Sequence, residues 1–221
     1  MSSTSRGVLD AADIVVVGET AWSNAYVDAL RERSDASVRV VPTAAAALDA
    51  LGASAVDCVV TDYELSGTTG VELARRIRDR TASLPVVLGT AAGSEAIASE
   101  AIGAGVTDYL AIDDPLPDAI DDAIRRTERA VREARRSVTR RERARQFDAS
   151  FRDARSATWV LDPDGRLTRV NQAALNMVDV DADAVVGDPF WTLPWWSEGD
   201  RPREDIRRLV DAARGGGVAH A

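Results

Sequence analysis

The sequence predicts an α/β protein whose first half forms a parallel, doubly wound sheet and whose second half is a smaller unit. Three observations indicate this arrangement. In the first half, short apolar runs alternate with segments of helical spacing, as in a sheet with helices on both faces. A long helical pattern follows from Pro115, and it is rich in arginine over residues 125–145. Beyond residue 151 the composition changes, since four of the five tryptophans lie there.

Five apolar runs are expected to be strands, with helices between them. The expected strands are residues 13–17, 38–41, 56–61, 85–89 and 109–112. The expected helices are residues 22–33, 43–53, a segment that begins at 69, and 94–104. Thr69 lies three residues before Glu72, which is the spacing of a capping box. Because the strands are continuously apolar, we expect helices to cover both faces of the sheet.

From Pro115 the pattern predicts one long helix. Its apolar and small residues recur at spacings of 4, 3, 4, 3 and 4, as in a heptad seam. These residues are Ile120, Ile124, Thr127, Val131, Ala134 and Val138. We therefore expect a homodimer through the helix at residues 120–138.

The same helix is basic. Residues 125–145 contain ten arginines and three glutamates, a local charge of +7, and such a helix also fits nucleic-acid binding. However, Glu128 and Glu133 precede Arg132 and Arg136 by four and three residues, at helix-stabilising distance. No aromatic residue interrupts the stretch. We expect a solvated connecting helix, with contact to DNA as an alternative.

The composition excludes several classes of chemistry. Cys58 is the only cysteine and His220 the only histidine, so an internal disulfide, a cysteine-rich metal site and histidine catalysis are not expected. Cys58 lies in an apolar strand, where a core position is expected. No apolar run is long enough to span a membrane, which favours a cytoplasmic protein. All 27 cations are arginine and the net charge is −9, as expected in a halophile; an ordinary acidic protein is the alternative.

Polar residues follow the expected strands where their carboxyl ends meet at one edge of the sheet. Gly18 and Glu19 follow the first strand, Asp62 the third and Thr90 the fourth, while Ile112 and Asp113 close the fifth. Ligands bind at this edge in doubly wound sheets. Carboxylate and hydroxyl oxygens suit Mg²⁺, so this edge is the candidate site.

Three segments at this edge carry a resemblance to a known family: residues 62–70, 84–91 and 104–109. Through them, residues 12–130 resemble the receiver domain of two-component response regulators. The resemblance implies a flavodoxin-like sheet of order 2-1-3-4-5. It also implies a partner histidine kinase or phosphotransfer protein.

The resemblance assigns roles to five residues of this chain. It implies that Asp62 is the phosphoacceptor, Thr90 the switch hydroxyl and Tyr109 the switch aromatic residue. It further implies that Mg²⁺ binds Glu19, Asp62 and the backbone carbonyl of Glu64.

Two positions depart from the family's pattern. Gly18 replaces one of two acids after the first strand, and Ile112 stands where receivers carry a lysine that pairs with the phosphoryl oxygens. The sequence thus leaves two functions open. Asp62 is phosphorylated, or the domain is a pseudo-receiver that acts as an interaction and dimerisation module without phosphorylation.

The second half, from about residue 147 to 214, resembles the N-terminal part of a PAS sensor domain. The segments that carry this are residues 159–167, 170–174 and 186–191. The resemblance implies three further strands beyond the end of this chain, so we expect a fragment or a truncated gene. Without a cysteine or an internal histidine here, a cysteinyl-flavin or the usual haem ligation is not expected.

These patterns give four expected regions. They are a disordered tail at 1–11, the receiver-like domain at 12–130, a linker helix at 131–150 and the PAS-like segment at 151–221. We expect a signal transduction protein, not an enzyme, that accepts a phosphoryl group on Asp62 and relays the signal through the PAS segment.

Overall fold

The computed structural model describes residues 7–91, 93–112, 116–152, 155–196 and 200–214. The chain divides into two compact units, Met1–Thr139 and Arg140–Ala221, and each is described by itself.

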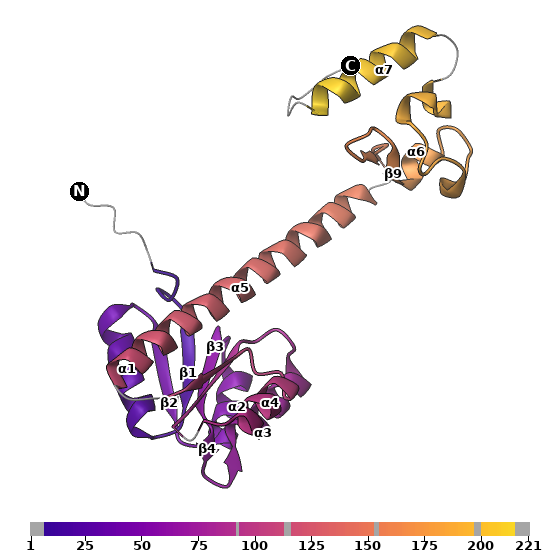
Figure 1. Cartoon of the computed structure of the whole chain (residues 1–221). Helices are drawn as coiled ribbons and strands as arrows, with labels where there is room; N and C mark the ends of the chain where they lie inside the picture. Colours follow the sequence, from indigo (N-terminus) through magenta and orange to yellow (C-terminus); the bar gives the residue numbers. More distant parts are fainter. Residues whose placement is uncertain (1–6, 92, 113–115, 153–154, 197–199, 215–221) are drawn as a thin grey trace, which may run out of the picture. The chain divides into compact units, whose positions relative to one another are not determined.

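The first unit contains a five-stranded parallel sheet of order β2-β1-β3-β6-β7 (Figure 1). Its strands are β1 (Asp13–Val17), β2 (Ser37–Val41), β3 (Cys58–Asp62), β6 (Val86–Thr90) and β7 (Asp108–Ala111). The order expected for a flavodoxin-like fold is therefore confirmed. A short antiparallel pair, β4 (Glu64–Leu65) and β5 (Thr68–Thr69), was not predicted.

Helices cover both faces of this sheet (Figure 1). On one face lie α1 (Ala21–Arg33) and the first half of α5 (Leu116–Phe151). On the other lie α2 (Ala44–Ala53), α3 (Gly70–Arg80) and α4 (Glu95–Gly103). Along β1 the side chains alternate between the two faces, and all those from Ile14 to Val17 are buried. This two-sided burial explains why the strands are continuously apolar.

The start of α3 confirms one half of the predicted capping box. Thr69 Oγ1 accepts a hydrogen bond from the backbone N–H of Glu72 at 3.2 Å. The Glu72 carboxylate instead pairs with Arg75 and Arg76, one turn further along the helix. The cap therefore satisfies one free N–H of the first turn.

The heptad positions of α5 are filled within the chain itself. Ile120, Ile124, Thr127 and Val131 are 4%, 9%, 0% and 0% exposed, and Thr127 Oγ1 lies 2.8 Å from the hydroxyl of Tyr26. Val138 is 46% exposed. The spacing that suggested a dimer seam is thus explained by packing of α5 on its own sheet.

Part of the expected N-terminal tail is folded. Residues 7–11 form turns, and Leu9 is 2% exposed in the core cluster shared with α1 and α5. Arg135 donates a hydrogen bond to the backbone carbonyl of Val8 at 2.9 Å. The prediction of disorder is wrong for residues 7–11, because Leu9 closes the apolar face at that end; residues 1–6 lie outside the described part.

The second unit contains an antiparallel strand pair, β8 (Trp159–Leu161) and β9 (Leu167–Val170). Four short helices and a longer one follow: α6 (Gln172–Leu175), η1 (Ala182–Ala184), η2 (Phe190–Thr192), η3 (Pro194–Trp196) and the longer α7 (Asp200–Arg214). Aromatic rings pack in the core of this unit, with the ring centroids of Trp159 and Phe190 5.6 Å apart.

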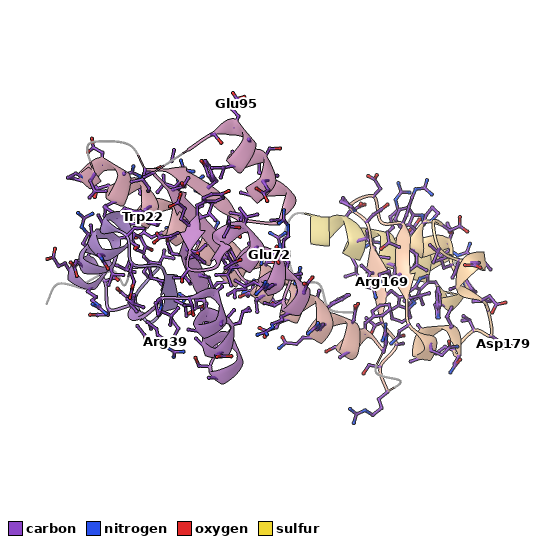
Figure 2. The ribbon with its side chains drawn as sticks, turned by 90° about the horizontal axis from the view of Figure 1, so that it is seen from below. Trp22, Arg39, Glu72, Glu95, Arg169 and Asp179 are labelled. Carbon is purple, nitrogen blue, oxygen red and sulfur yellow. The ribbon has the colours of Figure 1, made fainter. Side chains whose placement is uncertain are left out.

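The end of α5 belongs to this second unit and is fixed to β9 by Arg169 (labelled in Figure 2). The Arg169 guanidinium lies 4.6 Å from the ring centroid of Phe151 and 5.4 Å from that of Phe147. It also pairs with Asp148 at 2.9 Å.

Among the described residues, no helix is both long and apolar enough to cross a membrane.

Candidate functional site

A cleft of about 570 Å³ opens at the carboxyl end of the sheet in the first unit. Its walls come from several elements, with Asp62 on β3 and Thr90 on β6. Other lining residues are Trp22, Glu64, Ile112 and Leu116. The structure thus brings Asp62, Glu64 and Thr90 together, as the sequence predicts.

The Asp62 carboxylate is 2% exposed and its two oxygens differ in their surroundings. Oδ2 accepts hydrogen bonds from the backbone N–H of Thr20 and the hydroxyl of Ser23, both at 3.3 Å. Oδ1 is buried and has no hydrogen-bond partner among the described residues. Burial raises the pKa of Asp62, and the hydrogen bonds from Thr20 and Ser23 act in the opposite direction. Oδ1 is therefore the oxygen left for an incoming group.

Gly18 is not simply a lost acid. Its φ is +125°, and a Cβ on it would lie 1.9 Å from Asp62 Oδ2. The Asp62 carboxylate therefore occupies the space that a side chain at position 18 would need. The sequence shows that position 18 has no acidic side chain, but it does not show that the Asp62 carboxylate fills the space of that side chain.

Trp22 is a site residue that the sequence analysis missed. Its indole is 5% exposed, lines the cleft and packs on Gly89, where a Cβ would lie 2.2 Å from Trp22 Cζ2. The available signal was a tryptophan in the first turn of the helix that follows the first strand.

Tyr109 lies apart from the cleft. It lies beside Leu88 in the sheet and packs against the core on the α2, α3 and α4 side. Its hydroxyl is buried with no hydrogen-bond partner among the described residues. Thr90, by contrast, is 5% exposed and lines the cleft.

The acids near the cleft are few. Glu19 is exposed and is not among the lining residues, and Asp113 lies outside the described part. In the ranges that the structure describes, no three His, Cys, Asp or Glu side chains gather to hold a metal. The unpartnered Asp62 Oδ1 still fits a cation, so Mg²⁺ would be held by Asp62 and the Glu64 carbonyl.

Ile112 lies in the cleft wall, at the position where the resemblance to receivers implies a lysine. Its backbone N–H donates to the Thr90 carbonyl at 2.8 Å, and its side chain packs against the core on the α1 side. No arginine lines the described cleft. A phosphoryl group there would lack a charge-assisted bond from a side chain.

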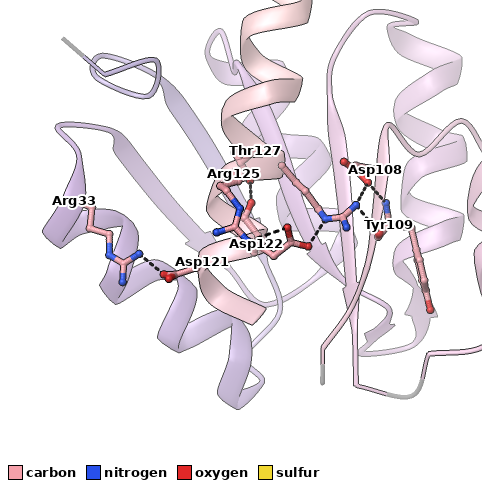
Figure 3. A network of polar contacts seen from close by, with 9 residues as sticks. Arg33, Asp108, Tyr109, Asp121, Asp122, Arg125 and Thr127 are labelled. Carbon is pink, nitrogen blue, oxygen red and sulfur yellow. Dashed lines mark hydrogen bonds and ion pairs between the residues drawn. The ribbon is translucent and has the colours of Figure 1, made fainter. Parts of the chain in front are cut away.

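Ion pairs hold α5 against β7 beside Tyr109 (Figure 3). Arg126 pairs with Asp122 and with Asp108, both at 2.6 Å. The hydrogen bond from Arg126 lowers the pKa of Asp122. On the same helix, Asp121 pairs with Arg33 of α1. These contacts fix the strand that carries Tyr109.

Cys58 is the first residue of β3 and lies in the core. It is 0% exposed, and burial raises the pKa of its thiol to about 12. The thiol therefore stays protonated, as suits a core residue.

Comparisons with known proteins agree with this geometry. Residues 14–113 match the family model described as the response regulator receiver domain, and residues 151–216 match the one described as the PAS fold. A signal receiver domain of an HD domain-containing protein from Pseudomonas fluorescens has a TM-score of 0.50 at 20% identity, covering 57% of this chain and 98% of that one. Residues 14–113 are therefore similar in sequence to response-regulator receiver domains, and the first unit shares the fold of a receiver domain.

Two curated relatives give the finer comparison. The transcriptional regulatory protein FixJ of Bradyrhizobium diazoefficiens is 31% identical over 122 residues, which are 54% of this chain and 60% of FixJ. The sensor histidine kinase TmoS of Ectopseudomonas mendocina is 40% identical over 57 residues, 26% of this chain and 6% of TmoS. The chain thus spans only part of each relative. Along this chain, a segment similar to receiver domains is followed by one similar to the PAS fold.

Proposed function

We propose that this chain is a phosphorelay protein that accepts a phosphoryl group on Asp62 from a partner histidine kinase or phosphotransfer protein. The observation that carries the proposal is the position of Asp62 and Thr90 in one cleft at the carboxyl end of the sheet. The similarity of residues 14–113 to receiver domains supports it. The PAS unit would then relay the signal.

The chemistry is displacement at phosphorus. Asp62 Oδ1, which has no hydrogen-bond partner among the described residues, attacks the phosphorus of a phosphohistidine. The P–N bond breaks as the O–P bond forms, and the imidazole leaves with the electron pair and takes a proton. A bound Mg²⁺ would neutralise charge on the phosphoryl oxygens. The Thr90 hydroxyl would donate a hydrogen bond to one of them.

Asp62 must be ionised to attack, and its burial opposes this. The cleft also lacks a cation at position 112. We therefore propose a receiver that is phosphorylated slowly and binds Mg²⁺ weakly.

A second candidate function is a phosphorylation-independent pseudo-receiver that acts through its surface. The specific observation in its favour is the packing of Asp62 Oδ2 against Gly18 and its hydrogen bonds to Thr20 and Ser23. These contacts hold the carboxylate inside the domain.

The test is labelling with acetyl phosphate, or with beryllofluoride, in the presence of Mg²⁺, followed by intact mass or NMR. We expect slow labelling of the wild type, none of Asp62→Asn, and faster labelling of Ile112→Lys. If neither the wild type nor Ile112→Lys is labelled, the pseudo-receiver is correct. If the wild type labels as fast as an ordinary receiver and Ile112→Lys changes nothing, the role assigned to position 112 is wrong.

The composition supports a further proposal about environment. The 36 acidic residues and the absence of lysine fit a high-salt cytoplasm, where carboxylates retain water. A melting temperature that rises with KCl concentration would support it, and a salt-independent one would oppose it.

A further inference from the structure

The outer face of α5 carries a row of arginines that neither the fold nor the proposed phosphorylation uses. Its members in the first unit are Arg125, Arg129, Arg132 and Arg136, all exposed. Their spacings of 4, 3 and 4 place them within about 60° of arc along about 17 Å of helix, at 3.6 residues per turn and 1.5 Å per residue. We call these four residues the arginine row.

The row lies opposite the buried side of the helix. Thr127 and Val131, which face the sheet, are fully buried, and they fall about half a turn away from the arginines. The row therefore points to solvent along its whole length. In the sequence the same spacing continues at Arg140 and Arg143.

Most of these charges are not neutralised within the domain. Arg125 pairs with Asp122 at 3.3 Å and its side chain remains 63% exposed. Arg129, Arg132 and Arg136 form no ion pair with a described residue. The pairing that the sequence suggested, from Glu128 to Arg132 and from Glu133 to Arg136, is likewise absent from the described contacts.

From these contacts we propose that the arginine row binds the phosphate backbone of duplex DNA. Guanidinium groups bind phosphate oxygens with paired hydrogen bonds. The row has no apolar or aromatic member, whereas a protein interface needs a buried apolar centre and a single-strand site needs rings for base stacking. Backbone contacts fix position without reading sequence, so the binding is independent of sequence.

The acidic remainder of the chain determines from which side a DNA duplex can approach. The net charge is −9, while residues 125–145 carry +7. A duplex is therefore repelled by the rest of the surface and approaches along α5. This surface operates whether or not Asp62 is phosphorylated.

The experiment is fluorescence anisotropy of the full chain with a labelled duplex of random sequence, over a series of salt concentrations. Four phosphate contacts predict a slope of log K against log salt of about −3.6, which is about a 150-fold loss between 50 and 200 mM. The variant Arg129→Gln/Arg132→Gln/Arg136→Gln should lower the slope to about −0.9. Circular dichroism should show an unchanged fold, since these side chains are exposed.

The matched control is Arg39→Gln/Arg75→Gln/Arg76→Gln. It removes the same charge from exposed positions on β2 and α3 and should keep the wild-type slope. Equal losses in both variants would overturn the proposal, as would a wild type without salt-dependent binding. Equal binding to polyglutamate, or to phosphatidylglycerol vesicles, would also overturn it, since the row would then bind any polyanion.

Discussion

The Asp62 carboxylate lies where a side chain on Gly18 would begin, with Oδ2 only 1.9 Å from the position of that missing Cβ. Position 18 thus controls where the Asp62 carboxylate rests. In this chain the carboxylate is drawn toward β1 and held by Thr20 and Ser23.

The first prediction is that Gly18→Ala destabilises the first unit by about 1–3 kcal/mol, because φ at this position is +125° and the new methyl group meets Asp62. Urea unfolding measures the loss. The control is Gly52→Ala in α2, where a Cβ meets nothing within 4 Å and should stabilise by about 0.5–1 kcal/mol. If both alanines are tolerated equally, the contact between Gly18 and Asp62 is not real.

The second prediction concerns pH. The pKa of Asp62 is raised in the folded protein above its unfolded value of about 3.9. Its contribution to stability is present below the unfolded pKa and is lost as pH rises through the folded pKa. Asp62→Asn cannot ionise, so it should be more stable than the wild type at neutral pH. The difference should shrink as pH falls toward about 4.

Asp121→Asn is the control, and its effect on stability at neutral pH should have the opposite sign to that of Asp62→Asn. The hydrogen bond from Arg33 lowers the pKa of Asp121, so ionised Asp121 favours the folded state. That contribution is present above the unfolded pKa and is lost as pH falls through the folded one. The variant should be less stable than the wild type at neutral pH. Thermal melts across pH measure both differences, and an Asp62→Asn curve parallel to the wild type would contradict the second prediction.

The third prediction separates core from surface on α5. Val131 is 0% exposed and Val138 is 46% exposed. Val131→Asp places an unpaired charge in the core and should cost more than about 4 kcal/mol, while Val138→Asp should change stability by less than about 0.5 kcal/mol. Denaturation with light scattering checks this. If Val131→Asp is folded and monomeric while the wild type is dimeric, the interpretation of α5 as a dimer seam is correct.

The fourth prediction concerns the second unit. Arg169→Ala removes contacts to Phe147, Phe151 and Asp148 and should destabilise that unit by roughly 1–2 kcal/mol. Limited proteolysis should then cut faster after about Arg145, with the first unit left intact. Arg143→Ala, at an exposed position of α5, is the control, and an equal rate for both variants would refute the role of Arg169.

Most of the fold could be predicted, because its strands are continuous apolar runs and its helices begin at recognisable caps such as Thr69. The pair β4 and β5 could not, since two-residue strands leave no periodic pattern. The heptad spacing of α5 predicts a dimer seam, but four of its residues are buried within the chain itself, so the spacing alone is no evidence for a dimer. A helix packed on its own sheet buries apolar residues at nearly the same spacing as a helix in a coiled coil, so the spacing does not distinguish the two.

The site was predictable in part. Asp62, Glu64 and Thr90 reach one cleft because the carboxyl ends of parallel strands share an edge. The placement of the Asp62 carboxylate was not predictable. It depends on an absent Cβ at Gly18 and on the packing of Trp22, and neither leaves a pattern in a single sequence.

The packing of Trp22 on Gly89 also restricts how this domain can change over generations. Any residue with a Cβ at position 89 would place that atom 2.2 Å from the indole. A smaller residue must therefore arise at position 22 before position 89 can depart from glycine. Lineages that keep the tryptophan should therefore keep the glycine. Where both positions have changed, the substitution at position 22 should have come first.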